Sequence, residues 1–143
     1  YQDTVISFDV RVLNVASDSG FTVSCRTTAN GGFTNGYTLR VLSMTRGTYD
    51  IVRWDRSNVT ELPNPPGFPV KAPLNTDGTP DHVELACVGS TITAFINKVP
   101  IVLANDRYMA YTTGQLRLQM TGSGNVEVHF SNVKVNHATL PNR

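Results

Sequence analysis

The sequence predicts an all-β fold, an antiparallel sandwich of two sheets, from three observations. Residues 81–97 alternate apolar and polar side chains on either side of Gly89–Ser90, and residues 21–26 alternate in the same way. A period of two is typical of strands with one buried face. Both cysteines, Cys25 and Cys87, fall in the buried phase of these strands. Short strands separated by regular turn signals favour a sandwich around a single core.

Nine strands are expected, each from a run in which apolar residues recur at every second position. In chain order they span 4–15, 21–28, 37–44, 49–55, 82–88, 91–97, 99–103, 115–121 and 126–135. Residues 29–36 are predicted to be a loop from their Gly and Asn content, and 105–113 a loop or a helical turn. Asn97–Lys98 is predicted to be a tight turn because Asn tolerates positive φ. Pro100 places the strand at 99–103 on a sheet edge.

Residues 57–80 differ from the rest of the chain. They contain six of the eight prolines, so they cannot form a central strand. Loops of this length are often functional. The alternative, which we favour, is an ordered strap that crosses from one sheet to the other and covers an edge.

Length and composition limit the function classes. The 143 residues are expected to form one domain over 1–135 with a tail at 136–143. A net charge of +1 gives no field that would draw the protein to nucleic acid or anionic membranes. Because no run of 18 apolar residues occurs, no membrane span is expected.

Two cysteines are too few for a disulfide-framework protein or a structural zinc site. A bond between Cys25 and Cys87 is the favoured interpretation, and two buried thiols are the alternative. The bond would close a loop of roughly 60 residues and stabilise the fold by about 4 kcal/mol in the chain-entropy model. It would also indicate an oxidising compartment.

The chain resembles the concanavalin A-like lectin and glucanase group, the LamG-like jelly rolls of bacterial extracellular proteins. The segments that carry the resemblance are SFDVRV at 7–12, GFTVSCR at 20–26, YTLRVL at 37–42, YDIVRWD at 49–55, HVELACVGSTITAFINKVPI at 82–101, TGQLRLQM at 113–120 and VEVHFSNVKV at 126–135. The resemblance implies a jelly-roll fold and an extracellular or cell-surface location. Such modules often have a further strand before the strand that carries the first segment, whereas here only Tyr1–Asp3 precede that strand, expected at 4–15. We therefore expect an open sheet edge beside the first strand.

A catalytic role is not expected. Glycosidases of this group carry clustered carboxylates, and hydrolysis needs two that flank the scissile bond. The three glutamates are isolated, at Glu61, Glu84 and Glu127. Asp50 and Asp55 should point to opposite faces of one strand, each as a solvated side chain or a cap. The histidines lack metal-ligand spacing, at His82, His129 and His137.

No cofactor is expected, and calcium is the minor alternative. Similar folds often hold calcium with loop oxygens, and hard oxygen ligands occur in predicted loops at Asp18, Asn30, Asn35, Asp77 and Asp106. No loop carries an acid-rich series of ligands, so we predict no metal site.

A binding site is the better hypothesis. A sugar site needs an aromatic ring for the apolar face of the sugar and a few fixed polar groups. The candidates for a concave sheet or its rim are Trp54, Phe95, Arg40, Arg53, Tyr108 and Tyr111. In the alternative interpretation, Trp54 and Phe95 pack beneath the 57–80 segment and the arginines are solvated surface charges.

The leading hypothesis is thus a non-catalytic, extracellular, lectin-like module that binds a glycan. The second is a structural or adhesive module that binds an extracellular protein or forms a homo-oligomer by strand addition at an open sheet edge. The third is a glycan hydrolase of the same superfamily.

Overall fold

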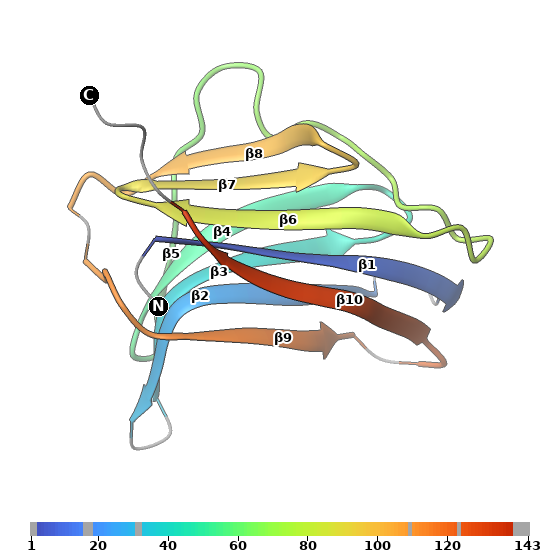
Figure 1. Cartoon of the computed structure of the whole chain (residues 1–143), viewed down its shortest axis with the longest axis horizontal. Helices are drawn as coiled ribbons and strands as arrows, with labels where there is room; N and C mark the ends of the chain where they lie inside the picture. The colour runs from blue at the N-terminus through green and yellow to red at the C-terminus, as the bar shows by residue number, and fades with distance from the viewer. Residues whose placement is uncertain (1–2, 16–18, 31–32, 109, 123, 139–143) are drawn as a thin grey trace.

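Two antiparallel sheets of five strands each face one another in the computed structural model (Figure 1). The structure describes residues 3–15, 19–30, 33–108, 110–122 and 124–138, with the backbone alone for 29, 30 and 33. The strands of the described residues are β1 (Thr4–Asn14), β2 (Gly20–Asn30), β3 (Phe33–Ser43), β4 (Thr48–Asp55), β5 (Asn58–Glu61), β6 (Asp81–Val88), β7 (Thr91–Ile96), β8 (Val99–Asn105), β9 (Gln115–Thr121) and β10 (Glu127–His137). The predicted jelly-roll β-sandwich is confirmed.

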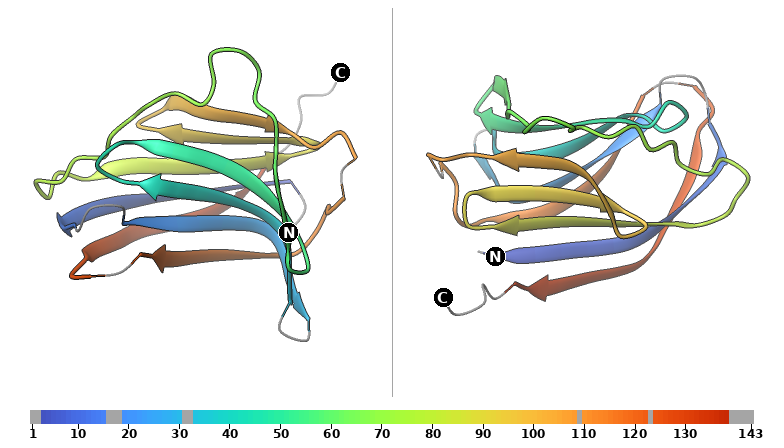
Figure 2. Two further views of the ribbon diagram at one scale, coloured as in Figure 1. Left: turned by 180° about the vertical axis from the view of Figure 1, so that it is seen from behind. Right: turned by 90° about the horizontal axis from the view of Figure 1, so that it is seen from above.

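The strand order differs from the sequence order in both sheets. The first sheet runs β10-β1-β6-β7-β8, and the second runs β5-β4-β3-β2-β9. The view from above in Figure 2 shows the sheets as two layers. Pro100 lies on the edge strand β8, as predicted, because proline cannot donate to a neighbouring strand.

Several strand boundaries correct the predictions. Within the expected loop at 29–36, residues 29–30 instead end β2 and residues 33–36 begin β3, and the two strands continue to pair at Thr28–Asn35 and Ala29–Thr34; residues 31–32 lie outside the described residues. This ribbon bends out of the sheet in Figure 1. Residues 58–61 form the edge strand β5, which the sequence analysis did not predict, and β10 continues to His137, past the expected start of the tail. Cross-strand pairing supports these extensions where the apolar alternation is weak or absent.

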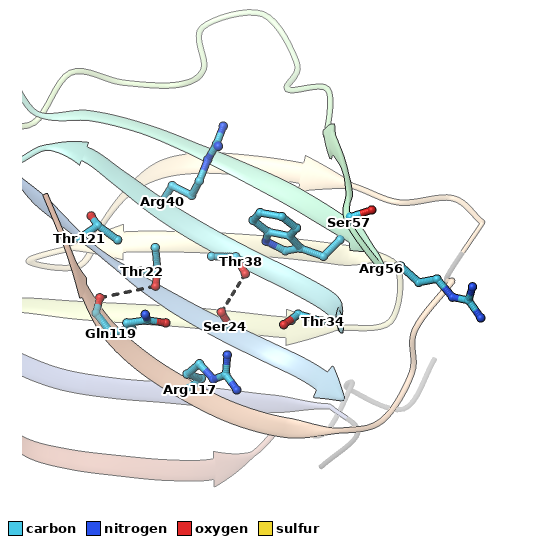
Figure 3. A pocket seen from close by; sticks show the side chains of 11 residues that line it. Thr22, Ser24, Thr34, Thr38, Arg40, Arg56, Ser57, Arg117, Gln119 and Thr121 are labelled. Atoms are coloured by element: carbon cyan, nitrogen blue, oxygen red, sulfur yellow. Dashed lines mark hydrogen bonds between the residues drawn. The ribbon is translucent and has the colours of Figure 1, made fainter. Parts of the chain in front are cut away.

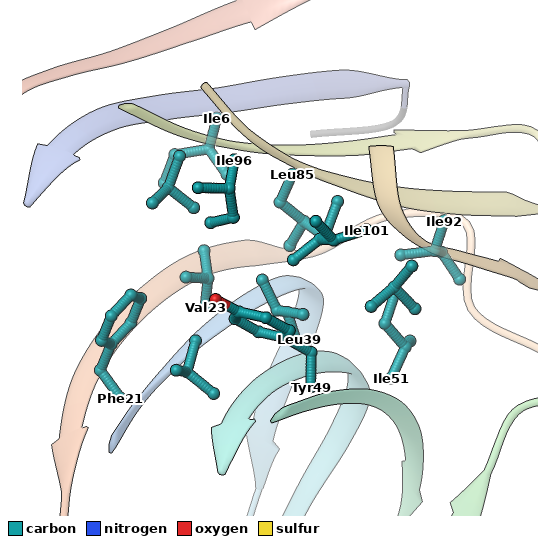
Figure 4. Close-up of a cluster of buried hydrophobic side chains, with 14 of the residues drawn as sticks. Ile6, Phe21, Val23, Leu39, Tyr49, Ile51, Leu85, Ile92, Ile96 and Ile101 are labelled. Carbon is teal, nitrogen blue, oxygen red and sulfur yellow. The ribbon is translucent and has the colours of Figure 1, made fainter. Parts of the chain in front are cut away.

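The core lies between the inner faces of the two sheets. Figure 4 shows Ile6, Leu85, Ile92, Ile96 and Ile101 from the first sheet opposite side chains of the second sheet. At one end the rings of Phe8, Phe21 and Phe130 make three edge-to-face contacts with centroids 5.4–6.0 Å apart. Met120 was expected to face this core but is 37% exposed, since it lies near the end of the edge strand β9.

A disulfide links the two layers. Cys25 on β2 and Cys87 on β6 are bonded, with their Cα atoms 6.7 Å apart, which confirms the prediction. Next to it, a bulge in β2 turns Arg26 into the interior, although the alternation placed this residue on the outer face. Its guanidinium donates to the carbonyl oxygens of Gly89 at 2.8 Å and Cys87 at 3.2 Å, and to the Asp3 carboxylate at 2.9 Å.

The segment after β5 is an ordered strap, as favoured from the sequence. Figure 1 shows it running along the β8 side of the sandwich to the start of β6. Val70 N–H donates to Ile101 O at 2.8 Å, and Asn64 Oδ1 accepts from Leu103 N–H at 3.0 Å, so the strap supplies partners to the edge strand β8. Leu62 and Leu74 anchor it in the core.

The expected open edge beside the first strand is not present. β1 pairs with β10 on one side and with β6 on the other, so both of its edges are occupied. Within the described residues, the sheet edges that no strand or strap covers belong to β10, β9 and the short β5.

Candidate functional site

The outer face of the second sheet carries a two-dimensional array of polar side chains. One row across the strands contains Gln119, Thr22, Arg40 and Asp50. The next row contains Arg117, Ser24 and Thr38 and ends at the buried, apolar Val52. Because successive side chains alternate between faces, the residues between these rows point into the core.

A hollow of about 500 Å³ opens on this face (Figure 3). Its lining combines hydroxyl, amide and guanidinium groups with one indole: Thr22, Ser24, Thr34, Thr38, Arg40, Trp54, Arg56, Ser57, Arg117, Gln119 and Thr121. Ser24 Oγ and Thr38 Oγ1 lie 2.8 Å apart and form a hydrogen bond on the floor of the hollow. The hydroxyl-rich strands thus present fixed polar groups around a single aromatic ring.

Trp54 lies at the β4 side of this hollow and is half-buried. It pairs across the sheet with Gly36 on β3 and Val59 on β5. Gly36 leaves the position beside the indole without a side chain. Its own φ is +127°, and a Cβ there would approach Arg26 O to 2.6 Å, so glycine is required. Because Trp54 lines the hollow, it lies on the outer face of the second sheet and not beneath the strap.

Arg40 is held in place by Asp50. Its Nε donates to Oδ1 at 2.8 Å and its Nη2 to Oδ2 at 2.5 Å, a bidentate pair. The hydrogen bonds to Asp50 raise the pKa of Arg40. Asp50 was expected to be solvated but is buried, because its cross-strand neighbour is the arginine that covers it.

Arg53 and Tyr111 belong to a different cluster, at one end of the sandwich. Arg53 donates to Asp55 at 3.0 Å and to Asp106 at 3.2 Å, while the Tyr111 hydroxyl donates to Asp55 at 2.6 Å. Tyr37 donates to Asp106 at 2.7 Å, and burial together with this bond raises the pKa of Tyr37 to about 12. Burial opposes the charge of Asp106, but the bonds from Tyr37 and Arg53 outweigh it and lower the pKa of Asp106.

Tyr108 and Phe95 lie outside both of these places. Tyr108 is 74% exposed, with the guanidinium of Arg107 5.2 Å from its ring centroid. Phe95 lies on β7 of the other sheet, in the outward phase, as its alternation predicted. Of the six candidates, the structure brings only Trp54 and Arg40 into the hollow.

The sequence analysis missed most of the polar lining. The signal was present in the outward phases of three predicted strands, which carry Thr22 and Ser24, Thr38, and Arg117 and Gln119. The sequence does not show the strand order that places β9 beside β2, and without this order the residues cannot be assigned to one site. Arg56 and Ser57 follow the end of β4, and their place at the hollow depends on the turn into β5.

Carboxylates do not gather on this face. Asp50, whose two oxygens are both bonded to Arg40, is set back from the lining, and Glu61 is exposed on β5. In the part of the chain that the structure describes, no three His, Cys, Asp or Glu side chains are grouped to hold a metal ion. Among the loop residues named for the minor calcium alternative, Asp106 is bonded to Tyr37 and Arg53, and Asp77 accepts from Thr79 N–H at 2.9 Å. Asp18 and the Asn30 side chain lie outside the described residues.

Residues 1–136 match the family described as the 3-keto-alpha-glucoside-1,2-lyase-like domain. The chain belongs to this family. The family is part of the concanavalin A-like glucanase superfamily, so the resemblance seen in the sequence is confirmed. No curated protein matches the chain.

Solved structures share the fold of this chain at low sequence identity. The carbohydrate-binding module CBM66 from Bacillus subtilis superposes with a TM-score of 0.69 at 14% identity, over 94% of this chain and 75% of the other. Sheep galectin-11 superposes with a TM-score of 0.62 at 12% identity, over 95% and 91%. Galectin LEC-6 from Caenorhabditis elegans has a TM-score of 0.60 at 13% identity, over 95% and 84%. At such identities the likeness establishes the fold alone.

The described residues of the chain contain no helix of the length and apolarity that crossing a bilayer requires.

Proposed function

We propose that this domain is a non-catalytic carbohydrate-binding module and that the hollow on the second sheet holds the sugar. The observation that carries the proposal is the gathering of Trp54, hydroxyl groups, an amide and guanidinium groups in one hollow of about 500 Å³. Small-molecule sites are commonly of this size, with a few placed polar groups beside an apolar surface. The names of the structural neighbours, a carbohydrate-binding module and galectins, support the same class of ligand.

The chemistry of the lining fits a sugar ring. One face of a pyranose presents C–H groups, which pack on the flat surface of an indole, while its hydroxyls need donors and acceptors around the edge. Trp54 supplies the surface, and Arg40, Gln119 and Thr22 supply the groups at the edge. Arg40 is fixed by Asp50 before any ligand arrives, which lowers the entropy lost on binding.

The carboxylate arrangement supports a module without catalysis. Glycoside hydrolysis by paired carboxylates needs an acid and a base on either side of the bond. The lining of the hollow offers no such pair among the described residues, and the nearby Asp50 is committed to Arg40.

The family name favours one further candidate, a lyase. A 1,2-elimination from a 3-keto sugar removes the C2 proton, which is acidic beside the ketone, and breaks the C1–O bond. The reaction needs a base near C2. If the domain is a lyase, incubation with a 3-keto disaccharide will release an enone that absorbs ultraviolet light. No absorbance above that of the buffer is the outcome expected for a binding module.

An extracellular or cell-surface location fits the disulfide. Disulfides persist in oxidising environments and are rare in reducing ones. The Cys25–Cys87 bond therefore supports the expected location.

Self-association remains the alternative role, now at a different edge. β10 is an 11-residue edge strand, and Val133 and Val135 on it are 53% and 40% exposed. Such an edge can pair with another chain. A concentration-dependent dimer in size-exclusion chromatography, lost in Val133→Lys, would favour this role.

The proposed site is tested with Trp54→Ala on a glycan array, followed by calorimetry with the best ligand. We expect the affinity to fall about tenfold or more, because stacking on an aromatic ring is removed. Phe95→Ala is the matched control, since it removes an outward aromatic from the opposite sheet and should leave the affinity unchanged. Wild-type protein that binds no glycan, or equal binding by Trp54→Ala, would refute the proposal.

A further inference from the structure

We propose that the hollow on the second sheet selects negatively charged saccharides, whose carboxylate or sulfate groups pair with Arg117 and Arg56. This inference rests on the proposed sugar-binding function and names the class of sugar. It follows from the charge of the lining, the free state of these two arginines and their placement around Trp54.

The lining is positively charged. Arg40, Arg56 and Arg117 line the hollow, and no acidic side chain of the described residues lines it with them. Asp50 neutralises Arg40 from behind, which leaves two positive charges. Glu61 on β5 attracts Arg40 but is not part of the lining, and with Glu61 counted the net charge is still positive.

Arg56 and Arg117 differ from the other described arginines in the partners of their guanidinium groups. Within the described residues, neither guanidinium has a hydrogen bond or an ion pair. Every other described arginine has a partner: Arg11 bonds a carbonyl, Arg26, Arg40 and Arg53 bond carboxylates, and Arg46 and Arg107 are also engaged. Both of these arginines, whose guanidinium groups have no partner among the described residues, line the hollow on the second sheet.

Their placement suits two ends of one ligand. Arg117 on β9 is in register with Ser24 and Thr38, so it stands about 10 Å, or two strand spacings, from β3. Arg56 lies two residues after Trp54, at the opposite side of the hollow. A saccharide stacked on the indole would extend toward Arg117, with Arg56 beside the stacked ring. In Figure 3 Arg117 and Arg56 lie on different sides of the hydroxyl groups of the floor, and the Arg56 side chain extends outward from them, so each arginine would pair with a different acidic group of the ligand.

A guanidinium without a protein partner is well suited to this role. Its planar donors match a carboxylate or a sulfate in a bidentate geometry, and such bonds are stronger than neutral ones. Because the arginines are exposed, salt should screen the attraction strongly. A neutral sugar gains nothing from these charges, so charge becomes the basis of selection.

The test compares sugars that differ only in charge. The panel contains oligogalacturonate, oligoglucuronate and a sulfated galactan fragment, each beside its methyl-esterified or desulfated form, with calorimetry at low and high salt. We expect the acidic member of the best-binding pair to bind about tenfold tighter at low salt and the gap to narrow at high salt. Whether the best-binding pair is a uronate or a sulfated galactan shows whether the hollow recognises carboxylate or sulfate.

Two charge-removing variants locate the effect. Arg117→Gln and Arg56→Gln should each weaken binding of the acidic sugar about three- to tenfold and weaken binding of the neutral form less, so that the preference for the acidic form shrinks. Lys71→Gln on the strap is the matched control, because it removes an exposed charge away from the hollow. Unchanged melting temperatures will show that the variants are folded.

The outcomes separate the two proposals. If a neutral sugar is the tightest binder and Trp54→Ala abolishes its binding, the charge selection is wrong and the sugar-binding function stands. If the arginine variants leave the acidic preference intact, the selection does not arise here and the inference falls. If no sugar binds, acidic or neutral, both proposals fall.

Discussion

At the scale of single residues, His82 is bonded on both sides by carboxylates. On the outer face of the first sheet, its Nδ1 lies 2.8 Å from Asp9 Oδ1 and its Nε2 lies 3.1 Å from Glu84 Oε1. Only the protonated ring carries hydrogen on both nitrogens, so only the imidazolium donates to both. The bond to Asp9, with a smaller part from Glu84, raises the pKa of His82 despite partial burial.

We predict that His82 stabilises the fold more at about pH 5.5 than at about pH 8. The folded pKa is higher than the unfolded one, so the contribution is complete below the unfolded pKa and is lost as the pH rises through the folded pKa. The side chain is 37% exposed, and screening by solvent keeps the effect below about 1 kcal/mol. Urea unfolding of wild type and His82→Gln at both pH values measures it.

The control for this measurement is His129→Gln on β10, whose Nε2 lies 3.0 Å from the Glu127 carboxylate. A loss of stability that is the same at both pH values for His82→Gln would contradict the doubly bonded imidazolium.

Single residues also show where prediction from the sequence stops. The apolar alternation located the inward side chains of β1, β6 and β7. It placed Arg26 outside and Asp50 in solvent, and both are buried. A local bulge turns Arg26 inward, and a cross-strand arginine covers Asp50. Neither the bulge nor the cross-strand contact can be read from the apolar and polar alternation of the strand that carries the residue.

At the scale of elements, the strap depends on a close approach to the turn between β3 and β4. Ala72 N–H donates to Gly47 O at 3.2 Å, and Leu74 N–H donates to Met44 O at 3.0 Å. Gly47 has a φ of +66°, and a Cβ there would lie 2.2 Å from the backbone of Ala72 and Pro73. The turn and the strap can meet only if this position has no side chain.

We predict that Gly47→Ala destabilises the protein by about 2–4 kcal/mol, the sum of a strained φ and a displaced strap. Gly89→Ala is the control, with a φ of +57° and open space around its Cβ, and should cost about 1 kcal/mol. Thermal unfolding of both variants measures the difference. If the two variants lose the same stability, the strap is not tightly packed at this point.

Elements were predicted better than their connections. Alternation and turn residues located nine of the strands, and prolines identified the strap. β5 was missed because a four-residue edge strand with all side chains exposed has no buried phase to detect. The pairing of residues 28–30 with 33–35 was missed because Gly and Asn predict a loop, whereas pairing with the partner strand keeps these residues extended.

At the scale of the whole molecule, the candidate site depends on which strands become neighbours. The hollow joins residues on β2, β3, β4 and β9, which are separated by up to about a hundred positions in the chain, a range that only tertiary pairing can span. The six predicted site residues were chosen for their chemistry. The topology places two of them in the hollow of the second sheet and the others on the first sheet or at one end of the sandwich. Strand phase is a local property, and strand order is not.

The disulfide is the one covalent tie between the two layers among the described residues, and it lies next to the buried Arg26. It joins positions 62 residues apart and so restricts the unfolded chain more than the folded one. The sulfurs lie within a core that pairs apolar faces of both sheets, so the fold itself does not require the bond.

We therefore predict that reduction lowers the free energy of unfolding by about 4 kcal/mol and leaves the β-sheet circular dichroism signal intact below the new melting temperature. Cys25→Ala/Cys87→Ala should match the reduced protein to within about 1–2 kcal/mol, the extra loss coming from two smaller side chains. Reductant should have no effect on this variant, which separates loss of the bond from other actions of the reagent. Ser24, which precedes Cys25 on β2, lines the hollow on the outer face of the second sheet. Sugar binding by the reduced protein, measured below its melting temperature, will therefore show whether this face keeps its structure without the bond. A reduced protein that is as stable as the oxidised one would show that the apolar faces alone hold the two layers together.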